Sequence, residues 1–336
     1  MERLVFLLVG CLVLTWSVAH LYRVAALALQ IVDTPNHRSA HRQATPTGAG
    51  IAFIGIFGLS LLLVDQSGTL SSAGEIFYDL LPPLLLVAAV GFIDDMKPLP
   101  WTVRAPVHLL AAGWIVKQLG FPVLVVFGVS LDLGFAGIVL GTLGLIWLLN
   151  LYNFMDGIDG IATGEAIFVL GSVVLLGLLF DPSGLSQPLL TLLACCFGFL
   201  LINWPKAKVF MGDGGSGFLG LMLGSLLLAE QVVNPWVWLI LLGWFVTDTG
   251  LTILMRLARG EKVYEAHSQH AYQHLNRRYG TSRTLLLIGA INIGWLLPCA
   301  AVATIAQDWA MVLLGCACLP LLIFQYFCGA GRAGSS

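Results

Sequence analysis

Three groups of aspartates stand at the boundaries of long apolar runs in this sequence. They are Asp94 with Asp95, Asp156 with Asp159, and Asp213 in a glycine-rich segment. Only 10% of the 336 residues are charged and 58% are hydrophobic, so carboxylates at these boundaries call for a chemical role. Carboxylates that converge on one site repel each other, and a divalent cation removes that repulsion. Oxygen ligands favour Mg²⁺ or Mn²⁺, so the acids predict one metal-dependent site at one face of a membrane.

The residues beside these acids refine the expected chemistry. Glycines on both sides of Asp213 let backbone N–H groups approach a phosphate. Lys97 closely follows Asp94 and Asp95 and pairs the acids with a cation, although helix capping is an alternative role for this acid pair. Basic side chains suit phosphate groups, so acids, bases and a metal together predict phosphoryl transfer.

Two asparagines lead into the second acidic group. Asn150 and Asn153 precede Asp156 and Asp159, which are three residues apart. If this segment is helical, the two acids share one face of the helix.

A later polar segment carries three histidines. His267, His270 and His274 are spaced at i, i+3 and i+7, which predicts one helical stripe. We expect this stripe to contact phosphate or substrate; a solvated amphipathic face and a zinc site are the alternatives. Asp248 lies within an apolar run and is a functional candidate, with pairing to a polar group of a neighbouring span as its alternative.

The apolar runs must position these side chains. The mean hydropathy is +0.91, and runs of about 20 apolar residues can each cross a bilayer as a helix. Eleven runs qualify, so we expect an all-α polytopic membrane protein. The expected spans are 4–22, 47–64, 76–93, 103–119, 134–152, 162–180, 186–203, 216–230, 235–255, 285–304 and 309–328. Residues 121–133 are too short and too β-branched for a span and predict a small surface hairpin.

The basic residues predict the orientation. With the N-terminus outside and the C-terminus inside, only Arg3 and Lys117 lie outside, and the other 14 of the 16 lysines and arginines lie inside. The same topology puts all three acidic groups and the histidines on the cytoplasmic face and the hairpin on the periplasmic face. We therefore expect one cytoplasmic-face site in a bacterial inner membrane.

The sequence resembles the polyprenyl-phosphate N-acetylhexosamine-1-phosphate transferases, glycosyltransferase family 4, over residues 33–283. The resemblance rests on five ordered segments, which are 39–50, 91–97, 150–160, 210–216 and 248–256. It implies one membrane transferase domain over 1–336, with 284–336 adding two C-terminal spans. It also implies transfer of a sugar 1-phosphate from a UDP-N-acetylhexosamine to undecaprenyl phosphate, with release of UMP. The reaction would start a lipid-linked envelope glycan such as O-antigen.

The resemblance carries residue roles wherever a motif matches. It implies that Asp213 is the ligand of Mg²⁺, with Mn²⁺ as an alternative metal. It implies that the catalytic acids are Asp94, Asp95, Asp156 and Asp159. The substrate-binding candidates, from the resemblance and the residues together, are His41, Arg42, Lys97, Asn150, Asn153, Asp248, His267, His270 and His274.

One segment departs from the family pattern. Relatives carry adjacent histidines where this chain has Tyr272 and Gln273. This version is most similar to the O-antigen-initiating branch of the WbpL type, whose donors are UDP-N-acetylfucosamine or UDP-N-acetylquinovosamine. UDP-N-acetylglucosamine is the alternative donor. A homodimer is left open, and no nucleic-acid partner is expected. The rival class is an ion-coupled transporter, which would place acids near the membrane midplane in an inverted repeat.

Overall fold

The computed structural model describes residues 2–34, 43–66, 72–181, 186–229, 233–262 and 267–332. In these ranges the regular structure is helical apart from two short antiparallel strand pairs. The helices are α1 (Glu2–Ala28), α2 (Ile51–Gln66), α3 (Ser72–Met96), α4 (Trp101–Leu119), α5 (Gly134–Met155), α6 (Ile161–Phe180), α7 (Gln187–Asn203), α8 (Gly212–Ala229), α9 (Pro235–Leu241), α10 (Gly243–Ala258), α11 (Ala271–Tyr279), α12 (Thr281–Ile291), α13 (Leu297–Ile305) and α14 (Ala310–Cys328). A π-helical turn, Asn292–Leu296, joins α12 to α13.

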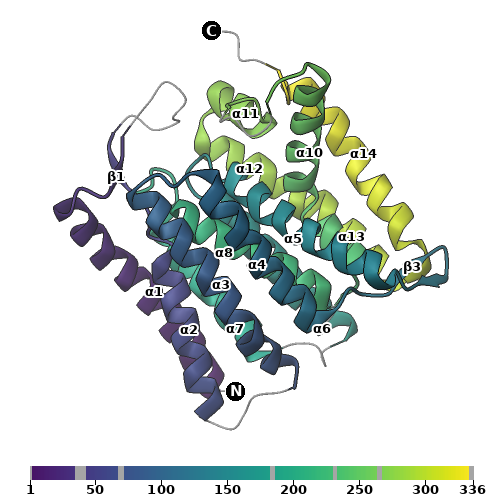
Figure 1. Ribbon diagram of the computed structural model, residues 1–336, viewed down its shortest axis with the longest axis horizontal. Coiled ribbons are helices and arrows are strands. Elements are labelled where there is room, and N and C mark those ends of the chain that lie inside the picture. The colour runs from purple at the N-terminus through teal and green to yellow at the C-terminus, as the bar shows by residue number, and fades with distance from the viewer. Residues whose placement is uncertain are drawn as a thin grey trace.

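Helix α8 lies at the centre of the bundle. It packs closely against α3 and α5, and 78% of its apolar window is buried inside the protein. Helices α1 and α14 lie at opposite edges (Figure 1), and only 17% of each corresponding window is buried. The bundle is therefore a buried central helix surrounded by helices whose outer faces are apolar and exposed, which suits a lipid environment.

The candidate spans follow the expected ranges. Each of the eleven expected ranges falls on a helix, or on helices joined end to end. In the described part of the chain, seven helices are long and apolar enough to cross a membrane, or eight if α9 and α10, bent by 77° relative to each other, form one span. Apolar helices 51–63 and 187–203 are shorter. The chain is thus a multi-pass membrane protein, and the number eleven stays a prediction.

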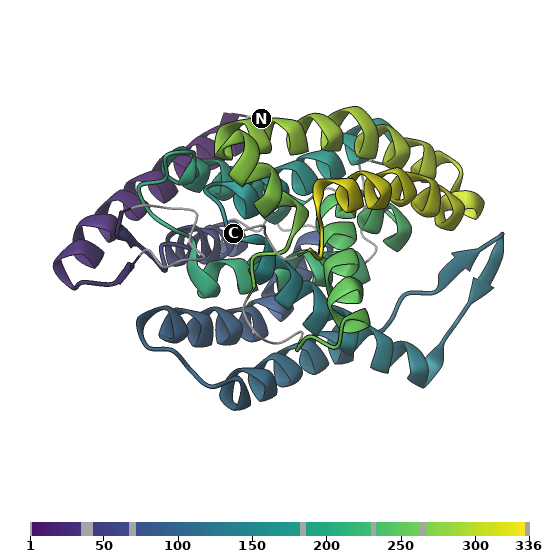
Figure 2. The same cartoon turned by 90° about the horizontal axis from the view of Figure 1, so that it is seen from above.

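Two small antiparallel pairs interrupt the helices. Strands β3 (Leu124–Val126) and β4 (Val129–Leu131) form a hairpin inside the range where one was expected. It projects from the bundle (Figure 2), and its side of the membrane stays a prediction. Strands β1 (Val32–Asp33) and β2 (Thr45–Pro46) pair where the sequence predicted none, and they join the end of α1 to the start of α2.

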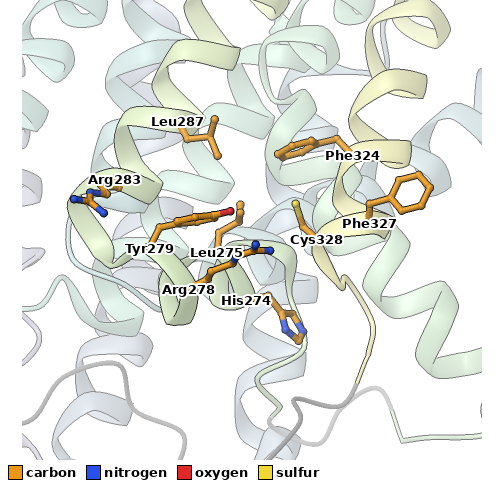
Figure 3. A pocket seen from close by; sticks show the side chains of 9 residues that line it. All are labelled: His274, Leu275, Arg278, Tyr279, Arg283, Leu287, Phe324, Phe327 and Cys328. Carbon is orange, nitrogen blue, oxygen red and sulfur yellow. The ribbon is translucent and has the colours of Figure 1, made fainter.

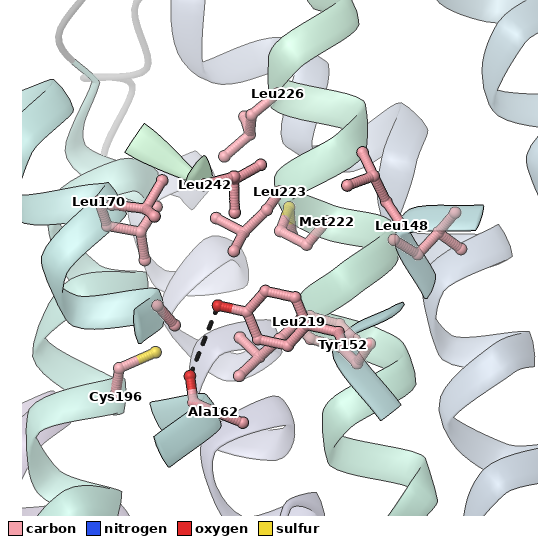
Figure 4. Packing of buried hydrophobic residues seen from close by; sticks show 14 of the residues in the cluster. Leu148, Tyr152, Ala162, Leu170, Cys196, Leu219, Met222, Leu223, Leu226 and Leu242 are labelled. Carbon is pink, nitrogen blue, oxygen red and sulfur yellow. Dashed lines mark hydrogen bonds between the residues drawn. The ribbon is translucent and has the colours of Figure 1, made fainter. Parts of the chain in front are cut away.

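The core around α8 is made of leucines, aromatic rings and small residues. Leu219, Leu223 and Met222 of α8 pack against Tyr152 of α5 (Figure 4), and all four side chains are fully or almost fully buried. The Tyr152 hydroxyl donates to the Ala162 carbonyl of α6 at 3.5 Å, so the ring carries a polar link across the apolar core. This packing fixes the ends of α5, α6 and α8 relative to one another.

Candidate active site

The end of α3 is joined to the start of α8 by a carboxylate. The two Asp95 oxygens accept the backbone N–H of Asp213 at 2.9 Å and of Gly214 at 3.4 Å. The first N–H groups of a helix have no partner within it, and its N-terminus carries partial positive charge. Asp95 therefore caps α8 from another span and brings the first and third acidic groups together.

Glycines allow this approach. A Cβ atom on Gly91 would lie 2.5 Å from the Gly214 nitrogen, and one on Gly50 would lie 2.5 Å from the Gly215 Cα. The Gly50 N–H also donates to the Met211 carbonyl at 2.9 Å. The backbones of α2 and α3 thus contact the start of α8 directly, and no side chain fits between them.

Arg104 bridges the other two acids at this junction. Its Nη1 lies 2.5 Å from Asp94 Oδ2 and 3.3 Å from Asp213 Oδ2. Asp94 Oδ1 also accepts the Leu99 backbone N–H at 2.5 Å. We did not predict Arg104 as a site residue; its signal was a charge in the first turn of an otherwise apolar run.

The second acidic group meets the same junction from α5. The Asn153 amide donates to the Ser216 hydroxyl of α8 at 3.2 Å, and this hydroxyl donates to the Gly212 carbonyl at 3.1 Å. Burial and the nearby charges of Asp213, Asp95 and Asp159 raise the pKa of Asp156 well above its ordinary value. All three acidic groups therefore contribute to one crowded, negatively charged region.

The segment of Asp156 and Asp159 is not helical, so the condition for a shared helix face is not met. Helix α5 ends at Met155 and α6 begins at Ile161, so the acids lie in the turn between them. Gly160 has φ = 74°, a left-handed conformation that glycine adopts without strain. Asp159 Oδ2 accepts the Ala207 N–H at 3.0 Å, which ties the turn to the segment before α8.

Asn203 supports this turn from α7 and was not predicted either. Its side-chain oxygen accepts the Gly160 N–H and the Thr163 hydroxyl, both at 3.1 Å. Its side-chain nitrogen donates to the Val209 carbonyl at 3.0 Å. The sequence carried no spacing signal for Asn203, because Gly160 and Thr163 lie 43 and 40 residues earlier in the chain.

The predicted histidine stripe does not form. His267 precedes α11, His270 is the residue before its first turn, and only His274 lies within the helix. His270 takes this place because the Gln273 side chain accepts its backbone N–H at 3.1 Å. The His267 and His270 rings stack with centroids 4.9 Å apart.

Two of these histidines are poor carriers of positive charge. Burial, with the neighbouring His270 and Arg256, lowers the pKa of His267 to about 4. Burial and the charge of Arg277 also lower the pKa of His274. His267 is therefore neutral at pH 7 and can offer a ring nitrogen but no cation to a phosphate.

Asp248 is fully buried and caps α11. Its carboxylate accepts the N–H of Ala271 at 2.8 Å and of Tyr272 at 3.0 Å, and it lies 3.5 Å from His270 Nδ1. These partners belong to α11, a short polar helix, and not to a neighbouring span as the alternative for Asp248 expected. Direct contact with substrate stays a prediction that its burial does not favour.

Helix α11 is docked onto the second acidic segment by Tyr272. Its buried hydroxyl donates to the Phe154 carbonyl at 3.1 Å. A Cβ on Gly157 would collide with this hydroxyl. The residue that departs from the family pattern is thus a packing contact between the histidine segment and the turn of Asp156.

The remaining candidates lie around this centre or outside it. The Asn150 amide donates to the Ile146 carbonyl of its own helix at 2.7 Å, and Lys97 is exposed just beyond α3. His41 and Arg42 lie outside the described residues.

The donor set suits a hard cation that shares its ligands with substrate. Among the described residues, no three acidic, histidine or cysteine side chains are spaced to hold a metal ion alone. Mg²⁺ commonly binds one or two carboxylates together with substrate phosphates. The oxygen donors of Asp94, Asp156 and Asp213, and the raised pKa of Asp156, are compatible with such an ion.

Comparisons with known proteins agree with this arrangement. The sequence model of glycosyl transferase family 4 matches residues 79–230, which span α3 to α8. The chain is 25% identical over 317 residues to the probable undecaprenyl-phosphate N-acetylglucosaminyl 1-phosphate transferase of Bacillus subtilis, covering 90% of this chain and 85% of that protein.

Two further relatives have related names. The decaprenyl-phosphate N-acetylglucosaminephosphotransferase of Mycobacterium tuberculosis is 29% identical over 343 residues, covering 90% of this chain and 83% of that protein. The undecaprenyl-phosphate alpha-N-acetylglucosaminyl 1-phosphate transferase of Yersinia pestis is 27% identical over 330 residues, with coverage of 89% and 85%. Residues 79–230 therefore match a glycosyl transferase family 4 domain, and the relatives that resemble most of the chain are named as polyprenyl-phosphate N-acetylglucosamine-1-phosphate transferases.

Proposed function

We propose that this protein transfers N-acetylhexosamine 1-phosphate from a UDP-sugar to undecaprenyl phosphate and releases UMP. The observation that carries the proposal is the junction at the ends of α3, α5 and α8. There Asp94 and Asp213 share Arg104, Asp95 caps α8, and Asp156 lies within reach of their charge. Carboxylates with an exchangeable cation are what phosphoryl transfer between two anionic substrates needs.

The proposed reaction is a single displacement at phosphorus, in which one phosphorus–oxygen bond forms and another breaks. An oxygen of the lipid phosphate attacks the β-phosphorus of the UDP-sugar, and the bond from that phosphorus to the bridging oxygen of UMP breaks. The products are a polyprenyl diphosphate sugar and UMP. Mg²⁺, when bound, would neutralise the diphosphate charge.

The residues divide into three roles in this proposal. Asp213, at the first turn of α8, would provide the carboxylate ligand of Mg²⁺, with Mn²⁺ as an alternative. Asp94 would orient or deprotonate the lipid phosphate once Arg104 turns from the carboxylates toward incoming phosphate oxygens. Asp156 and Asp159 would shape the nucleotide site, because the turn that holds them is fixed by Asn203 and Tyr272.

The donor is proposed from two observations of different weight. The relatives compared above are named for N-acetylglucosamine, which favours UDP-N-acetylglucosamine. The altered segment at Tyr272 and Gln273 was our reason for expecting a 6-deoxy donor, such as N-acetylfucosamine or N-acetylquinovosamine. Both side chains are used in packing and capping α11, so this departure says little about the sugar. We therefore place N-acetylglucosamine first and keep the 6-deoxy sugars as the alternative.

The proposed setting is the bacterial inner membrane, with the site on the cytoplasmic face where UDP-sugars are made. The positive-inside distribution supports this placement. A homodimer stays a prediction.

The test is UMP release by purified protein in detergent. We expect turnover only when a UDP-N-acetylhexosamine, undecaprenyl phosphate and Mg²⁺ are all present. Asp213→Asn should lower the rate at least 100-fold, because it removes a charged ligand that acts in the transition state. Asp308→Asn, an exposed acid far along the chain in a short helical turn, should keep the parent rate.

A second assay separates the enzyme from the transporter. Radiolabelled sugar should appear in solvent-extractable lipid, which no transporter produces. A panel with the three UDP-sugars named above then ranks the donors by kcat/KM. Metal-independent turnover, or an unchanged rate of UMP release in Asp213→Asn, would contradict the proposal.

A further inference from the structure

A cavity of about 470 Å³ lies between α11, α12 and α14, apart from the acidic junction. Figure 3 shows side chains from all three helices around it. Arg278 comes from α11, Arg283 and Leu287 from α12, and Phe324 and Phe327 from α14. The proposed transfer reaction leaves this cavity without a role.

The polar part of the cavity carries positive charge. Arg278 and Arg283 are both exposed, and the Arg278 guanidinium lies 5.2 Å from the centroid of the Tyr279 ring, which holds it at the wall. No carboxylate is among the described residues that line the cavity. Two guanidinium groups with no lining acid favour an anion, and their planar donor sets match phosphate oxygens.

The apolar part of the cavity lies along the ends of two candidate spans. The spans are Thr281–Ile305, which begins beside Arg283, and Gln307–Cys328, which ends beside Phe327. Leu287 is one helical turn, about 6 Å, further into the span than Arg283. Phe327 is 77% exposed although it is large and apolar. The cavity therefore changes from basic to apolar along the direction in which a lipid passes from headgroup to chain.

We propose that this cavity binds an anionic phospholipid of the surrounding leaflet, with its phosphodiester between Arg278 and Arg283. The first carbons of its chains would lie against Leu287, Phe324 and Phe327. A soluble phosphate ester has no acyl chains to cover this apolar wall. A zwitterionic lipid would place its own positively charged group beside the two arginines. Basic pockets between membrane helices are known to favour anionic lipid headgroups.

The position of the cavity gives the bound lipid a structural effect. Its α11 wall belongs to the helix that Asp248 caps and that Tyr272 docks onto the Phe154 carbonyl. The α14 wall is tied to α11 as well, because His274 Nε2 lies 3.2 Å from the Arg332 carbonyl. A lipid in the cavity would therefore hold α11 against α12 and α14.

Native mass spectrometry of the full chain in detergent tests this proposal. The probes are phosphatidylglycerol, phosphatidylcholine of the same chains, and glycerol 3-phosphate. The test variant is Arg278→Gln with Arg283→Gln. Its matched control is Arg3→Gln with Lys117→Gln, which also removes two exposed positive charges but does not touch the cavity. We expect one phosphatidylglycerol to bind the parent and the control, with at least tenfold weaker binding to the test variant.

Further arms distinguish the lipid from its headgroup. Phosphatidylcholine should bind the parent at least tenfold more weakly than phosphatidylglycerol, and glycerol 3-phosphate should not displace the lipid. Phe327→Ser should weaken phosphatidylglycerol binding while leaving both arginines in place. If the double arginine variant does not fold, Phe327→Ser becomes the test variant. Equal lipid affinity in the test variant and the control, or displacement by glycerol 3-phosphate, would overturn the proposal.

Discussion

At the residue scale, the site is a set of carboxylates whose charges are only partly balanced. Arg104 supplies one positive charge to Asp94 and Asp213, and the start of α8 supplies partial charge to Asp95. Asp156 has no such partner among these contacts, and its raised pKa reflects burial first and the nearby negative charges second. A cation among these acids would offset the part of the shift that comes from charge.

This imbalance predicts a linkage between Mg²⁺ binding and pH. The folded protein holds a proton on Asp156 at pH values where the unfolded chain has lost it, so folding stability falls as pH rises above the ordinary carboxyl pKa of about 4. Mg²⁺ should offset this loss. We expect a larger Mg²⁺-induced rise in Tm at pH 8 than at pH 5.5, equivalent to about 1.4 kcal/mol when Mg²⁺ is at ten times its Kd.

Thermal unfolding in detergent with and without Mg²⁺ checks this linkage. Asp308→Asn should behave like the parent, and Asp213→Asn should lose most of the shift. Buffer with EDTA and without added divalent cations provides the metal-free reference. A shift of equal size at both pH values would show that the acids do not share a cation with Asp156.

The acids could be selected from the sequence because charge is rare in this chain, so each carboxylate at the edge of an apolar run was conspicuous. Arg104 and Asn203 were missed, since the contacts of Arg104 with Asp213 and of Asn203 with Gly160 form only when folding brings distant segments together. The histidine stripe failed for a local reason. His270 begins α11 rather than lying inside it, and a spacing of three and four does not reveal where a helix starts.

At the scale of elements, the site depends on helices that touch through glycine. Gly91 of α3 meets the Asp213–Gly214 peptide of α8, whereas Gly164 of α6 has open space where a Cβ would lie. The two positions form a matched pair, because alanine lowers the flexibility of the unfolded chain equally at both.

We expect opposite outcomes at these two glycines. Gly91→Ala should push α3 from α8, lower the free energy of unfolding by about 1–3 kcal/mol and reduce UMP release, because Asp95 can no longer reach the Asp213 N–H. Gly164→Ala should be neutral or stabilising by up to about 1 kcal/mol. Thermal unfolding and the UMP assay measure both effects. Parent-like activity in Gly91→Ala would mean that the junction is less tight than its backbone contacts indicate.

Tyr272 offers a second test at this scale. Tyr272→Phe removes only the hydroxyl that docks α11 onto the Phe154 carbonyl, so it should cost about 1 kcal/mol of stability. If that contact positions the turn of Asp156 and Asp159, KM for the UDP-sugar should rise several-fold with a smaller change in kcat. Tyr279→Phe, on the exposed end of the same helix, is the control. An unchanged KM would limit Tyr272 to a packing role.

At the scale of the whole molecule, the topology is the prediction with the widest reach. Helix α1 begins at one end of the bundle and α14 finishes at the other (Figure 1), as an odd number of crossings would give. Hydropathy located the apolar helices, because the bilayer sets both the length and the composition of a span, but it did not locate α11, which is short and polar. It could not decide which helices cross completely, since α2 and α7 are apolar but short, and α9 and α10 are bent by 77° relative to each other.

Cysteine labelling in whole cells tests the orientation. Ser130→Cys in the β3–β4 hairpin should react with a membrane-impermeant maleimide, because the hairpin is expected outside. Ser282→Cys at the start of α12 should react only after permeabilisation. Both serines are exposed, and the parent chain gives the background from its own thiols. The reverse pattern would invert the topology and move the acidic junction to the periplasmic face.

The difference in length between α8 and α1 has a consequence for the membrane itself. Helix α8 has 18 residues, or about 27 Å, and α1 has 27 residues, or about 40 Å, against a hydrocarbon thickness of about 30 Å. The outer helix is thus longer than the hydrocarbon layer is thick, and the central helix is slightly shorter than it. Because α8 is enclosed by the surrounding helices, the difference in length is taken up inside the protein and not by the lipid. In the proposed reaction, the Asp213 end of this short helix would lie where a lipid phosphate can reach it without leaving its own leaflet.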